Sequence, residues 1–308
     1  MTPHKNIAAS VRDRLLSQSR KADGGSGFNR LLVRYVIERF LYRMSLSKVR
    51  DRFILKGAVL FVLWSPSPLR ATGDLDLLGL GENDTDSIGK LFVEICRVDV
   101  PDDGLVFDRE AITVEPMRAE EQYPGVRVRL AATLGTAKVP FQVDIGFGDV
   151  IHPGPQEIEY PRLLTEFPSA RLRAYPPETV IAEKLEAMVR FDELTSRLKD
   201  HYDMWAISRT FDFEMSTLSA AVMKTFERRK TALPSSLLAP LSPEFASLPA
   251  KRQQWQAFLK LTSPTLVPPV FEKLMVELTA FVGPVFAATR SSRAEGRWSP
   301  DRGWTDAR

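Results

Sequence analysis

The sequence predicts an α+β fold in which a mixed β-sheet is preceded by a helical hairpin and followed by a helical bundle. Three observations predict it: helical spacing of apolar residues at the N-terminus, period-two alternation in the middle of the chain, and helical spacing again from about residue 175 onward. We expect one domain over residues 1–175, a helical domain over residues 176–290 and a mobile tail over residues 291–308.

The composition is that of a globular protein. The chain has 308 residues, is 44% hydrophobic and carries a net charge of +3, which excludes disorder as the main state. Its single cysteine, Cys96, excludes an internal disulfide framework and a Cys-rich zinc module. The longest apolar run, Ala58–Trp64, is shorter than the ~20 residues that span a bilayer, and the N-terminus lacks the apolar core of a signal peptide. We therefore expect a cytoplasmic protein without a membrane partner.

The first elements form a basic helical hairpin. Apolar residues have helical spacing in Asn6–Arg20 and Asn29–Arg43, and the Gly-rich stretch Lys21–Gly27 separates the two helices. Residues 1–56 hold 13 Lys and Arg against four acids, a surplus of +9. Such a surface suits a phosphate backbone, with Arg30 and Arg34 about one helical turn apart as candidate contacts, although a solvated helix face gives the same pattern.

The next elements are strands, and two of them carry acids. Asp74–Leu78 alternates so that Asp74 and Asp76 share one face, and Val139–Phe147 alternates so that Asp144 points away from the apolar face. Further strands are expected around residues 111–114 and 125–134.

If these strands are neighbours, the three acids converge. Carboxylates in one place repel each other unless a divalent cation is bound, and oxygen ligands suit Mg²⁺ or Mn²⁺. We therefore predict a metal site at Asp74, Asp76 and Asp144 that serves phosphoryl or nucleotidyl transfer by two-metal chemistry. The alternative is that Asp74 and Asp76 are surface acids on an edge strand.

The residues before the Asp pair favour a nucleotide. Gly57 and Ala58 stand at the start of an apolar helix, where backbone N–H groups can approach a phosphate, and a loop with Arg70 and Thr72 leads into Asp74. We expect Gly57, Ala58, Arg70 and Thr72 to contact an NTP. A glycine, a helix, a loop, an Asp-x-Asp and a later strand Asp follow one another in this order in the nucleotidyltransferase fold.

The helical domain adds a lysine and two acids. Lys184 lies on a helix predicted over Glu178–Phe191 and could hold a triphosphate, although a surface lysine is the simpler interpretation. Asp200 and Asp203 share a face of the helix Arg197–Ser208. In a continuous helix, Asp200 would lie about 24 Å along the axis from Lys184, too far for both to serve one active site. We therefore predict a turn within Asp192–Arg197, with Thr195 or Ser196 as N-cap of the second helix. Three more helices are predicted over Met215–Arg228, Lys251–Leu261 and Pro269–Thr289.

Taken together, these segments resemble a known family. The motifs are Glu38-Arg-Phe-Leu-Tyr-Arg43, Phe53-Ile-Leu-Lys-Gly57, Arg70-Ala-Thr-Gly-Asp-Leu-Asp-Leu77, Val143-Asp-Ile145, Glu183-Lys-Leu-Glu-Ala187, Ser196-Arg-Leu-Lys-Asp-His-Tyr-Asp203 and Thr225-Phe-Glu-Arg-Arg229. The sequence is similar to the AbiEii/AbiGii nucleotidyltransferase-like toxins, which include the MenT toxins. The resemblance covers most of the chain, and of these motifs only the Asp-x-Asp is widely shared outside the family.

The resemblance implies a function and a set of site residues. It implies a toxin that uses Mg²⁺ to transfer nucleotides from NTP onto RNA, in some members onto the 3′ end of tRNA, and a cognate antitoxin that counters it. It further implies that Asp74 and Asp76 bind metal, that Lys184 contacts the nucleotide and that Asp200 or Asp203 is a further essential acid. Gly57-Ala58 departs from the Gly-Ser or Gly-Gly common in the family, so a hydroxyl contact to phosphate is lost there.

Two other functions are compatible with the sequence. One is an enzyme of the same fold that nucleotidylates a small molecule or a protein, in which case the basic N-terminal segment has no part in the site. The other is a catalytically inactive module that acts by binding a partner protein, in which case the three acids do not converge.

Overall fold

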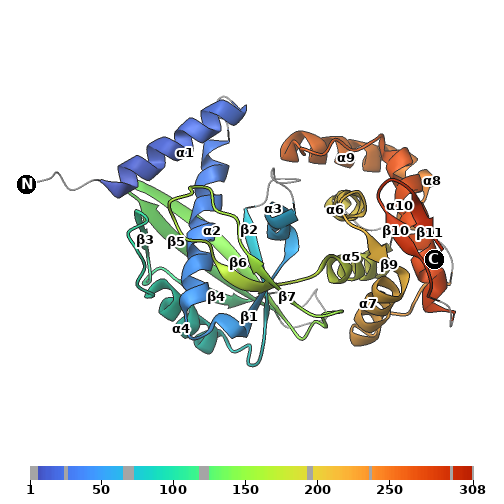
Figure 1. Ribbon diagram of the computed structural model, residues 1–308, viewed down its shortest axis with the longest axis horizontal. Helices are drawn as coiled ribbons and strands as arrows, with labels where there is room; N and C mark the ends of the chain where they lie inside the picture. The colour runs from blue at the N-terminus through green and yellow to red at the C-terminus, as the bar shows by residue number, and fades with distance from the viewer. Residues whose placement is uncertain are drawn as a thin grey trace, which may run out of the picture. The chain divides into compact units, whose positions relative to one another are not determined.

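The computed structural model describes residues 6–23, 27–64, 73–117, 125–192, 197–235, 238–291 and 294–306. The chain forms two compact units, each described by itself below. The first unit comprises Met1–Leu63, Thr72–Gly148 and Glu157–Ala174, and the second comprises Trp64–Ala71, Asp149–Gln156 and Tyr175–Arg308. Figure 1 shows the order of their helices and strands along the chain.

The N-terminal part of the chain contains two long helices, a sheet and a shorter helix (Figure 1). Its elements are α1 (Ile7–Asp23), α2 (Phe28–Leu46), η1 (Arg50–Arg52), β1 (Phe53–Lys56), η2 (Gly57–Leu60), α3 (Phe61–Trp64), β2 (Asp74–Gly79), α4 (Thr85–Cys96), β3 (Leu105–Phe107), β4 (Thr113–Pro116), β5 (Gly125–Leu134), β6 (Ala137–Phe147), β7 (Gln156–Glu159) and β8 (Arg171–Ala174). The predicted hairpin and the predicted strands at Asp74, Gly125 and Val139 are confirmed.

The strands of the described residues form one mixed sheet in the order β3–β5–β6–β2–β1–β8–β7, and β4 also pairs with β5. β2 pairs in parallel with β6 and antiparallel with β1, so β2 lies inside the sheet rather than at its edge. This excludes the interpretation of Asp74 and Asp76 as acids of an edge strand.

Helices α2 and α4 cover one face of the sheet. Phe40 of α2 packs on Phe92 of α4 and on Phe141 of β6, with ring centroids 5.5 and 5.6 Å apart. Phe53 of β1 also packs on Phe92. Because side chains alternate along a strand, Leu75 and Leu77 of β2 join this core while Asp74 and Asp76 point to the opposite face.

The second unit is mostly helical. Its elements are α5 (Pro177–Phe191), α6 (Leu198–Ser208), β9 (Phe213–Glu214), α7 (Met215–Arg228), η4 (Ala239–Leu241), α8 (Pro243–Ser247), α9 (Pro249–Thr262), α10 (Phe271–Thr289), β10 (Arg297–Ser299) and β11 (Gly303–Thr305). The apolar helix α10 packs against α6, α7 and α8 and forms the centre of this core. No helix in the described parts of the chain is both long enough and apolar enough to cross a bilayer.

The C-terminal residues differ from the expected mobile tail, because β10 and β11 form a hairpin that pairs with β9. Trp298 packs on Phe281 of α10 with centroids 4.8 Å apart and donates its indole N–H to the Ser208 carbonyl. Trp304 donates its indole N–H to the Phe281 carbonyl. Aromatic burial on α10 therefore orders a segment that has little apolar periodicity.

Candidate active site

The three predicted sheet acids share one face of the first unit. Asp76 lies opposite Asp144 in the parallel β2–β6 pair, and Asp74 lies opposite Gln142. The same row continues to Lys56 on β1 and to Arg127 on β5. Because direct cross-strand partners point to the same side of a sheet, the row places two acids between two basic residues, on the face that α2 and α4 leave uncovered.

Gly57 lies directly beside the side chain of Asp76. Its φ is +75°, in the left-handed region that disfavours residues with a side chain. A Cβ added there would lie 2.7 Å from both Cβ and Cγ of Asp76, closer than atoms of real side chains approach. The glycine predicted for phosphate binding therefore also gives Asp76 its space. Ala58 follows in η2 and adds no polar group.

Asp144 is held by side chains of its own sheet. Arg127 binds it with two hydrogen bonds, Nε to Oδ1 and Nη2 to Oδ2, both 2.8 Å long, and the Gln142 amide donates to Oδ1 at 3.0 Å. The hydrogen bond to Asp144 raises the pKa of Arg127, which keeps the guanidinium charged. Sequence reasoning missed this partner, although Arg127 and Asp144 stand equally far from the Gly135-Thr136 turn of the β5–β6 hairpin.

The donor atoms on this face fit a hard divalent cation. Asp74 is exposed, Asp76 is half-buried, and their oxygens are the ligand type that Mg²⁺ prefers. Within the described residues, no three His, Cys, Asp or Glu side chains are arranged to hold a metal ion. Since Arg127 binds both oxygens of Asp144, a cation that used all three acids would have to compete with the guanidinium for this carboxylate. The predicted NTP contacts Arg70 and Thr72 lie outside the described residues.

A second cluster lies on α5 and α6. The predicted break between the helices is confirmed: α5 ends at Phe191 and α6 begins at Leu198, with Arg197 at the N-cap position. The proposed caps Thr195 and Ser196 lie outside the described residues. The reversal brings Lys184 Nζ to 2.7 Å from Asp200 Oδ1 and 2.7 Å from Asp203 Oδ2.

This Lys–Asp–Asp cluster is buried. The side-chain exposed fractions are 15% for Lys184, 4% for Asp200 and 0% for Asp203. Burial alone would raise the pKa of Asp200, but Lys184 and Arg197, whose Nε lies 2.8 Å from Asp200 Oδ2, outweigh burial and lower it. Asp200 is therefore a carboxylate at neutral pH.

An arginine from another motif supports α5 beside Lys184. Arg229 contacts Glu186 at 2.7 Å, Asp149 at 3.0 Å and Glu183 at 3.4 Å. Burial would lower its pKa, but the surrounding acids raise it. Thr231 adds a hydrogen bond to Glu186 at 2.7 Å. This network, which sequence reasoning did not anticipate, fixes the helix turn that carries Lys184.

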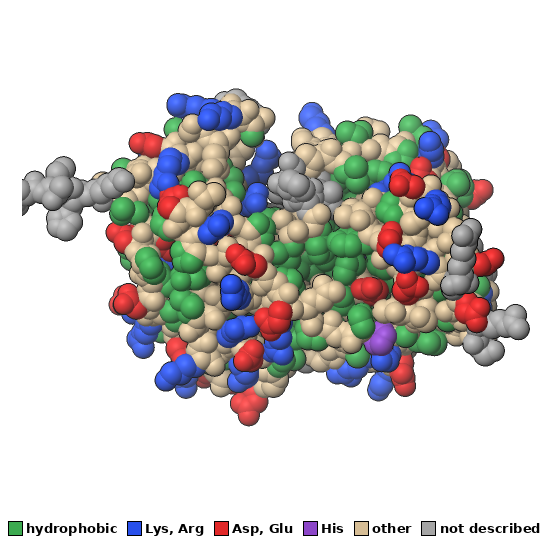
Figure 2. All heavy atoms as spheres, viewed as in Figure 1, with side chains coloured by type: hydrophobic (Ala, Val, Ile, Leu, Met, Phe, Trp, Pro, Cys, Tyr) green, Lys and Arg blue, Asp and Glu red, His purple; other side chains and the backbone are tan. Residues whose placement is uncertain are grey.

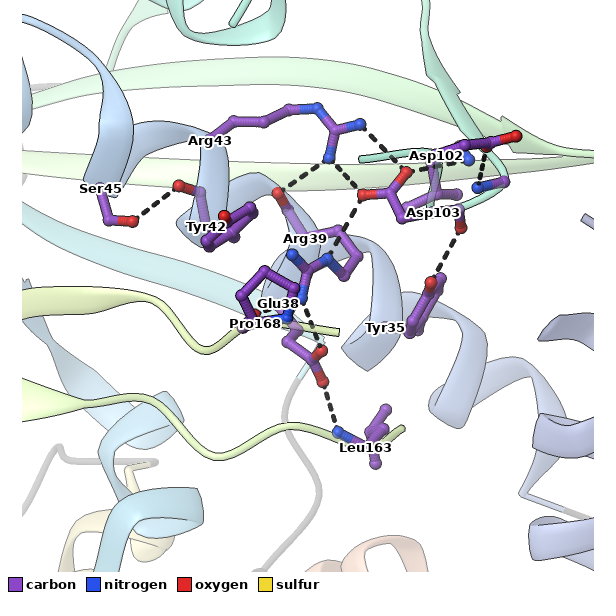
Figure 3. Close-up of polar contacts among 12 residues, drawn as sticks. Tyr35, Glu38, Arg39, Tyr42, Arg43, Ser45, Asp102, Asp103, Leu163 and Pro168 are labelled. Carbon is purple, nitrogen blue, oxygen red and sulfur yellow. Dashed lines mark hydrogen bonds and ion pairs between the residues drawn. The ribbon is translucent and has the colours of Figure 1, made fainter. Parts of the chain in front are cut away.

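Part of the N-terminal positive charge serves the fold (Figure 3). Arg43 binds Asp103 through both carboxylate oxygens at 2.6 and 3.0 Å, and Arg39 lies 3.3 Å from the same carboxylate and 2.8 Å from the Pro168 carbonyl. Glu38 accepts a hydrogen bond from the Leu163 amide. These side chains are buried. Part of the +9 surplus of positive charge is therefore buried, and only the rest lies on the surface.

Other basic residues of the hairpin reach solvent. Arg12, Arg20 and Lys21 of α1 are exposed, and Figure 2 shows basic side chains along this helix. Of the two arginines predicted to contact RNA, Arg30 is exposed, whereas Arg34 is half-buried and its buried Nε makes no hydrogen bond. The prediction for this pair stays a prediction.

Comparison with known proteins gives a consistent result. The family model of the nucleotidyl transferase AbiEii toxin, type IV toxin–antitoxin system, matches residues 39–277. The chain is similar in structure to a proposed nucleotidyltransferase from H. pylori, with a TM-score of 0.50 and 13% identity over 84% of this chain and 96% of the other. A second Helicobacter pylori structure, JHP933, gives a TM-score of 0.48 and 13% identity over 85% of this chain and 93% of the other. No curated protein matches the sequence.

Proposed function

The chain belongs to the AbiEii nucleotidyltransferase toxin family, and from this premise we propose that it transfers nucleotides from NTP onto RNA, at the 3′ end of tRNA, in a Mg²⁺-dependent reaction. The family is that of the toxin in a toxin–antitoxin pair, which implies a nucleotide substrate and an antitoxin partner. In our proposal the protein acts in the cytoplasm, where tRNA and NTP are both available.

The observation that carries this proposal is the row of acids on the sheet. Asp76 and Asp144 are direct cross-strand neighbours, and Asp74 stands on the same face two residues along β2. The face is free of α2 and α4, and Gly57 leaves space beside Asp76. This arrangement offers the oxygens of Asp74 and Asp76 to a cation, next to backbone that a phosphate can approach, with Asp144 opposite Asp76 on β6.

We assign the residues as follows. Asp74 and Asp76 would hold Mg²⁺, and Asp144 would join them when Arg127 releases it. Bound Mg²⁺ would lower the pKa of the RNA hydroxyl and neutralise the triphosphate. The 3′ oxygen of the RNA bonds to the α-phosphorus of the NTP, the bond to the bridging oxygen breaks, and pyrophosphate leaves with both electrons of that bond. The hydroxyl proton passes to solvent.

Lys184 is assigned to the triphosphate by the family resemblance. An ammonium group has three N–H donors, and Asp200 and Asp203 accept two of them, which fixes its direction. Asp200 and Asp203 act through Lys184 in this scheme, so they are positioning residues. Gly57 and Ala58 would offer backbone N–H groups to a phosphate.

The experiment that tests the proposal is an Asp76→Asn substitution. Asn has nearly the same shape, so the fold should remain, but a ligand and a negative charge are lost, and transfer of labelled nucleotide to total RNA should fall by at least about 100-fold. Glu82→Gln, at an exposed position of the same unit, is the matched control and should keep full activity.

The outcome also separates the alternatives. Full activity of the Asp76→Asn variant contradicts the metal assignment. Label that appears on protein or on a small molecule instead of RNA contradicts the RNA acceptor. If the unchanged protein transfers no nucleotide to any acceptor, the proposal that it is a nucleotidyltransferase is contradicted.

A further inference from the structure

A basic pocket lies on the first unit, outside the acid row. It has a volume of about 400 Å³, within the usual range for ligand sites, and is lined by Gly89, Lys90, Val93, Arg97, Arg109 and Ile112. We call it the α4 pocket. Three of its six lining residues are basic and none is acidic.

The local structure explains why these residues meet. Lys90, Val93 and Arg97 are spaced by three and four residues, so they share one face of α4. Arg109 and Ile112 come from the turn between β3 and β4, where Asp108 accepts a hydrogen bond from the Ala111 amide at 3.2 Å. The turn and the helix are fixed to each other because α4 packs on β4.

The basic residues of the pocket are not held in ion pairs. Among the described residues, Lys90, Arg97 and Arg109 have no ion-pair partner. Asp108 and Glu110, which flank Arg109, do not line the pocket, and Asp108 lies 3.6 Å from Lys138 instead. Asp84, before the first turn of α4, interacts with Lys90 at longer range and does not line the pocket either. The buried arginines Arg39 and Arg43 and the half-buried Arg127 are different, since each of them is paired with a carboxylate. Three unpaired cations around one hollow form a site for anions.

The pocket is separate from the proposed reaction site. Phe92 of α4 packs on Phe40 and Phe53, on the face of the sheet that carries the apolar residues. Asp74, Asp76 and Asp144 point to the other face. A triphosphate held by the acids therefore cannot occupy the pocket. A ligand of the pocket is therefore a second anionic group, separate from that triphosphate.

We propose that the α4 pocket binds backbone phosphates of the acceptor RNA, away from its reacting 3′ end. This inference rests on the proposed RNA acceptor. A folded RNA is long enough to pass the edge of the sheet, where β3 and β4 both pair with β5, and so to contact both faces. Cationic contacts to the backbone give affinity without sequence preference and position the acceptor.

The test replaces the three cations together, as Lys90→Gln, Arg97→Gln and Arg109→Gln, in the full chain. Binding of tRNA is measured by fluorescence anisotropy at several salt concentrations. Loss of three phosphate contacts should weaken binding at low salt and reduce the slope of log affinity against log salt by about 2 to 3. Binding of Mg-NTP, measured by calorimetry, should not change.

The control removes the same charge from exposed positions outside the basic N-terminal segment, as Lys230→Gln, Lys260→Gln and Lys273→Gln. An equal loss of slope in this control would show a general charge effect and overturn the proposal. An unchanged slope in the pocket variant, or no RNA binding by the unchanged protein, would overturn it as well.

Two further measurements separate the possible failures. Inorganic phosphate that binds the unchanged protein and not the pocket variant, with unchanged affinity for tRNA, would identify a site for a free anion instead. If the unchanged protein transfers nucleotides to RNA while the slope of the pocket variant is unaltered, the proposed function stands and only the pocket assignment fails.

Discussion

At the scale of single residues, Gly57 supports the site in two ways. It adopts a backbone conformation that costs a residue with a side chain about 1–2 kcal/mol, and its missing Cβ leaves room for Asp76. We predict that Gly57→Ala lowers the free energy of unfolding by at least that amount and abolishes nucleotide transfer, because Asp76 must move. Urea unfolding and the transfer assay measure the two effects.

Gly73 offers the matched control for this substitution. It directly precedes Asp74, its φ is not in the left-handed region, and no described atom lies within 4 Å of an added Cβ. Gly73→Ala should therefore leave stability and activity nearly unchanged. If the two alanine variants behave alike, the space beside Asp76 does not matter for the site.

The pair of Arg127 and Asp144 leads to a second prediction at this scale. Under the proposed metal assignment, a cation competes with the guanidinium for the oxygens of Asp144. Arg127→Gln should therefore tighten Mn²⁺ binding, which electron paramagnetic resonance can follow without any turnover. Arg129→Gln is the control, since Arg129 pairs with Glu115 and not with Asp144. Weaker Mn²⁺ binding by the Arg127 variant would instead mean that Arg127 positions Asp144.

At the scale of secondary-structure elements, the cluster on α5 and α6 changes an expectation. From the sequence, Lys184→Ala and Asp200→Ala should cost little stability, because apolar neighbours such as Leu185 and Trp205 carry the packing. The structure gives a different expectation, because Asp200 and Asp203 are buried and removal of Lys184 takes away a countercharge that both contact. A buried charge that has lost its partner costs about 3–5 kcal/mol.

We therefore predict that Lys184→Met lowers the free energy of unfolding by about 3–5 kcal/mol as well as abolishing transfer. A variant with Lys184→Met, Asp200→Asn and Asp203→Asn combined removes all three charges and should recover most of the stability without recovering activity. Urea unfolding of both variants measures the difference. Equal stability of the single and the combined variant would show that the charges of this cluster do not hold α5 and α6 together.

Local patterns predict much of the fold at this scale. Residue spacing predicts the N-terminal hairpin, β5, β6 and the helices from Pro177 onward. The break between α5 and α6 is predicted because a single continuous helix would hold Lys184 and Asp200 too far apart. The Arg127–Asp144 contact also follows from hairpin symmetry. The β10–β11 hairpin could also have been predicted, because the turn residues Ser299–Gly303 lie between Trp298 and Trp304.

Contacts between distant segments could not be predicted. The contact between Gly57 and Asp76 depends on the β1–β2 register, which no tight turn fixes. Asp103 meets Arg39 and Arg43 across about sixty residues of sequence, and a single sequence does not show which acid an arginine will meet. For the same reason, the surplus of basic residues near the N-terminus did not distinguish buried from exposed arginines.

At the scale of the whole molecule, acid should destabilise the fold through a histidine. His201 of α6 is fully buried, stacks on Phe245 and contacts the Pro240 carbonyl at 2.8 Å. Burial lowers its pKa below the ordinary value of 6.5, despite the raising effect of the Pro240 carbonyl and of Asp200. As pH falls, the unfolded chain therefore binds a proton before the native chain does.

The histidine thus contributes stability that is fully present above pH 6.5 and is lost as the pH falls toward the lowered native pKa. We predict that the free energy of unfolding decreases by up to about 1.4 kcal/mol per pH unit in this range. His201→Gln should reduce this slope, whereas His152→Gln, at a more exposed position, should leave most of it. Urea unfolding between pH 5 and 8 tests this, and the same slope in all three proteins would contradict it.

The buried network of α2 has a consequence for synthesis on the ribosome. Glu38 is made early, yet the Leu163 amide that binds its buried carboxylate is made 125 residues later, and β8 pairs with β1 across a similar span. While the chain is growing, the acid row can therefore exist before the first unit is complete. A product that stops before Leu163 keeps Asp74, Asp76 and Asp144 but lacks the amide that binds Glu38 in the complete fold. Such incomplete chains should be removed by proteolysis, so that only the complete toxin accumulates in the cell.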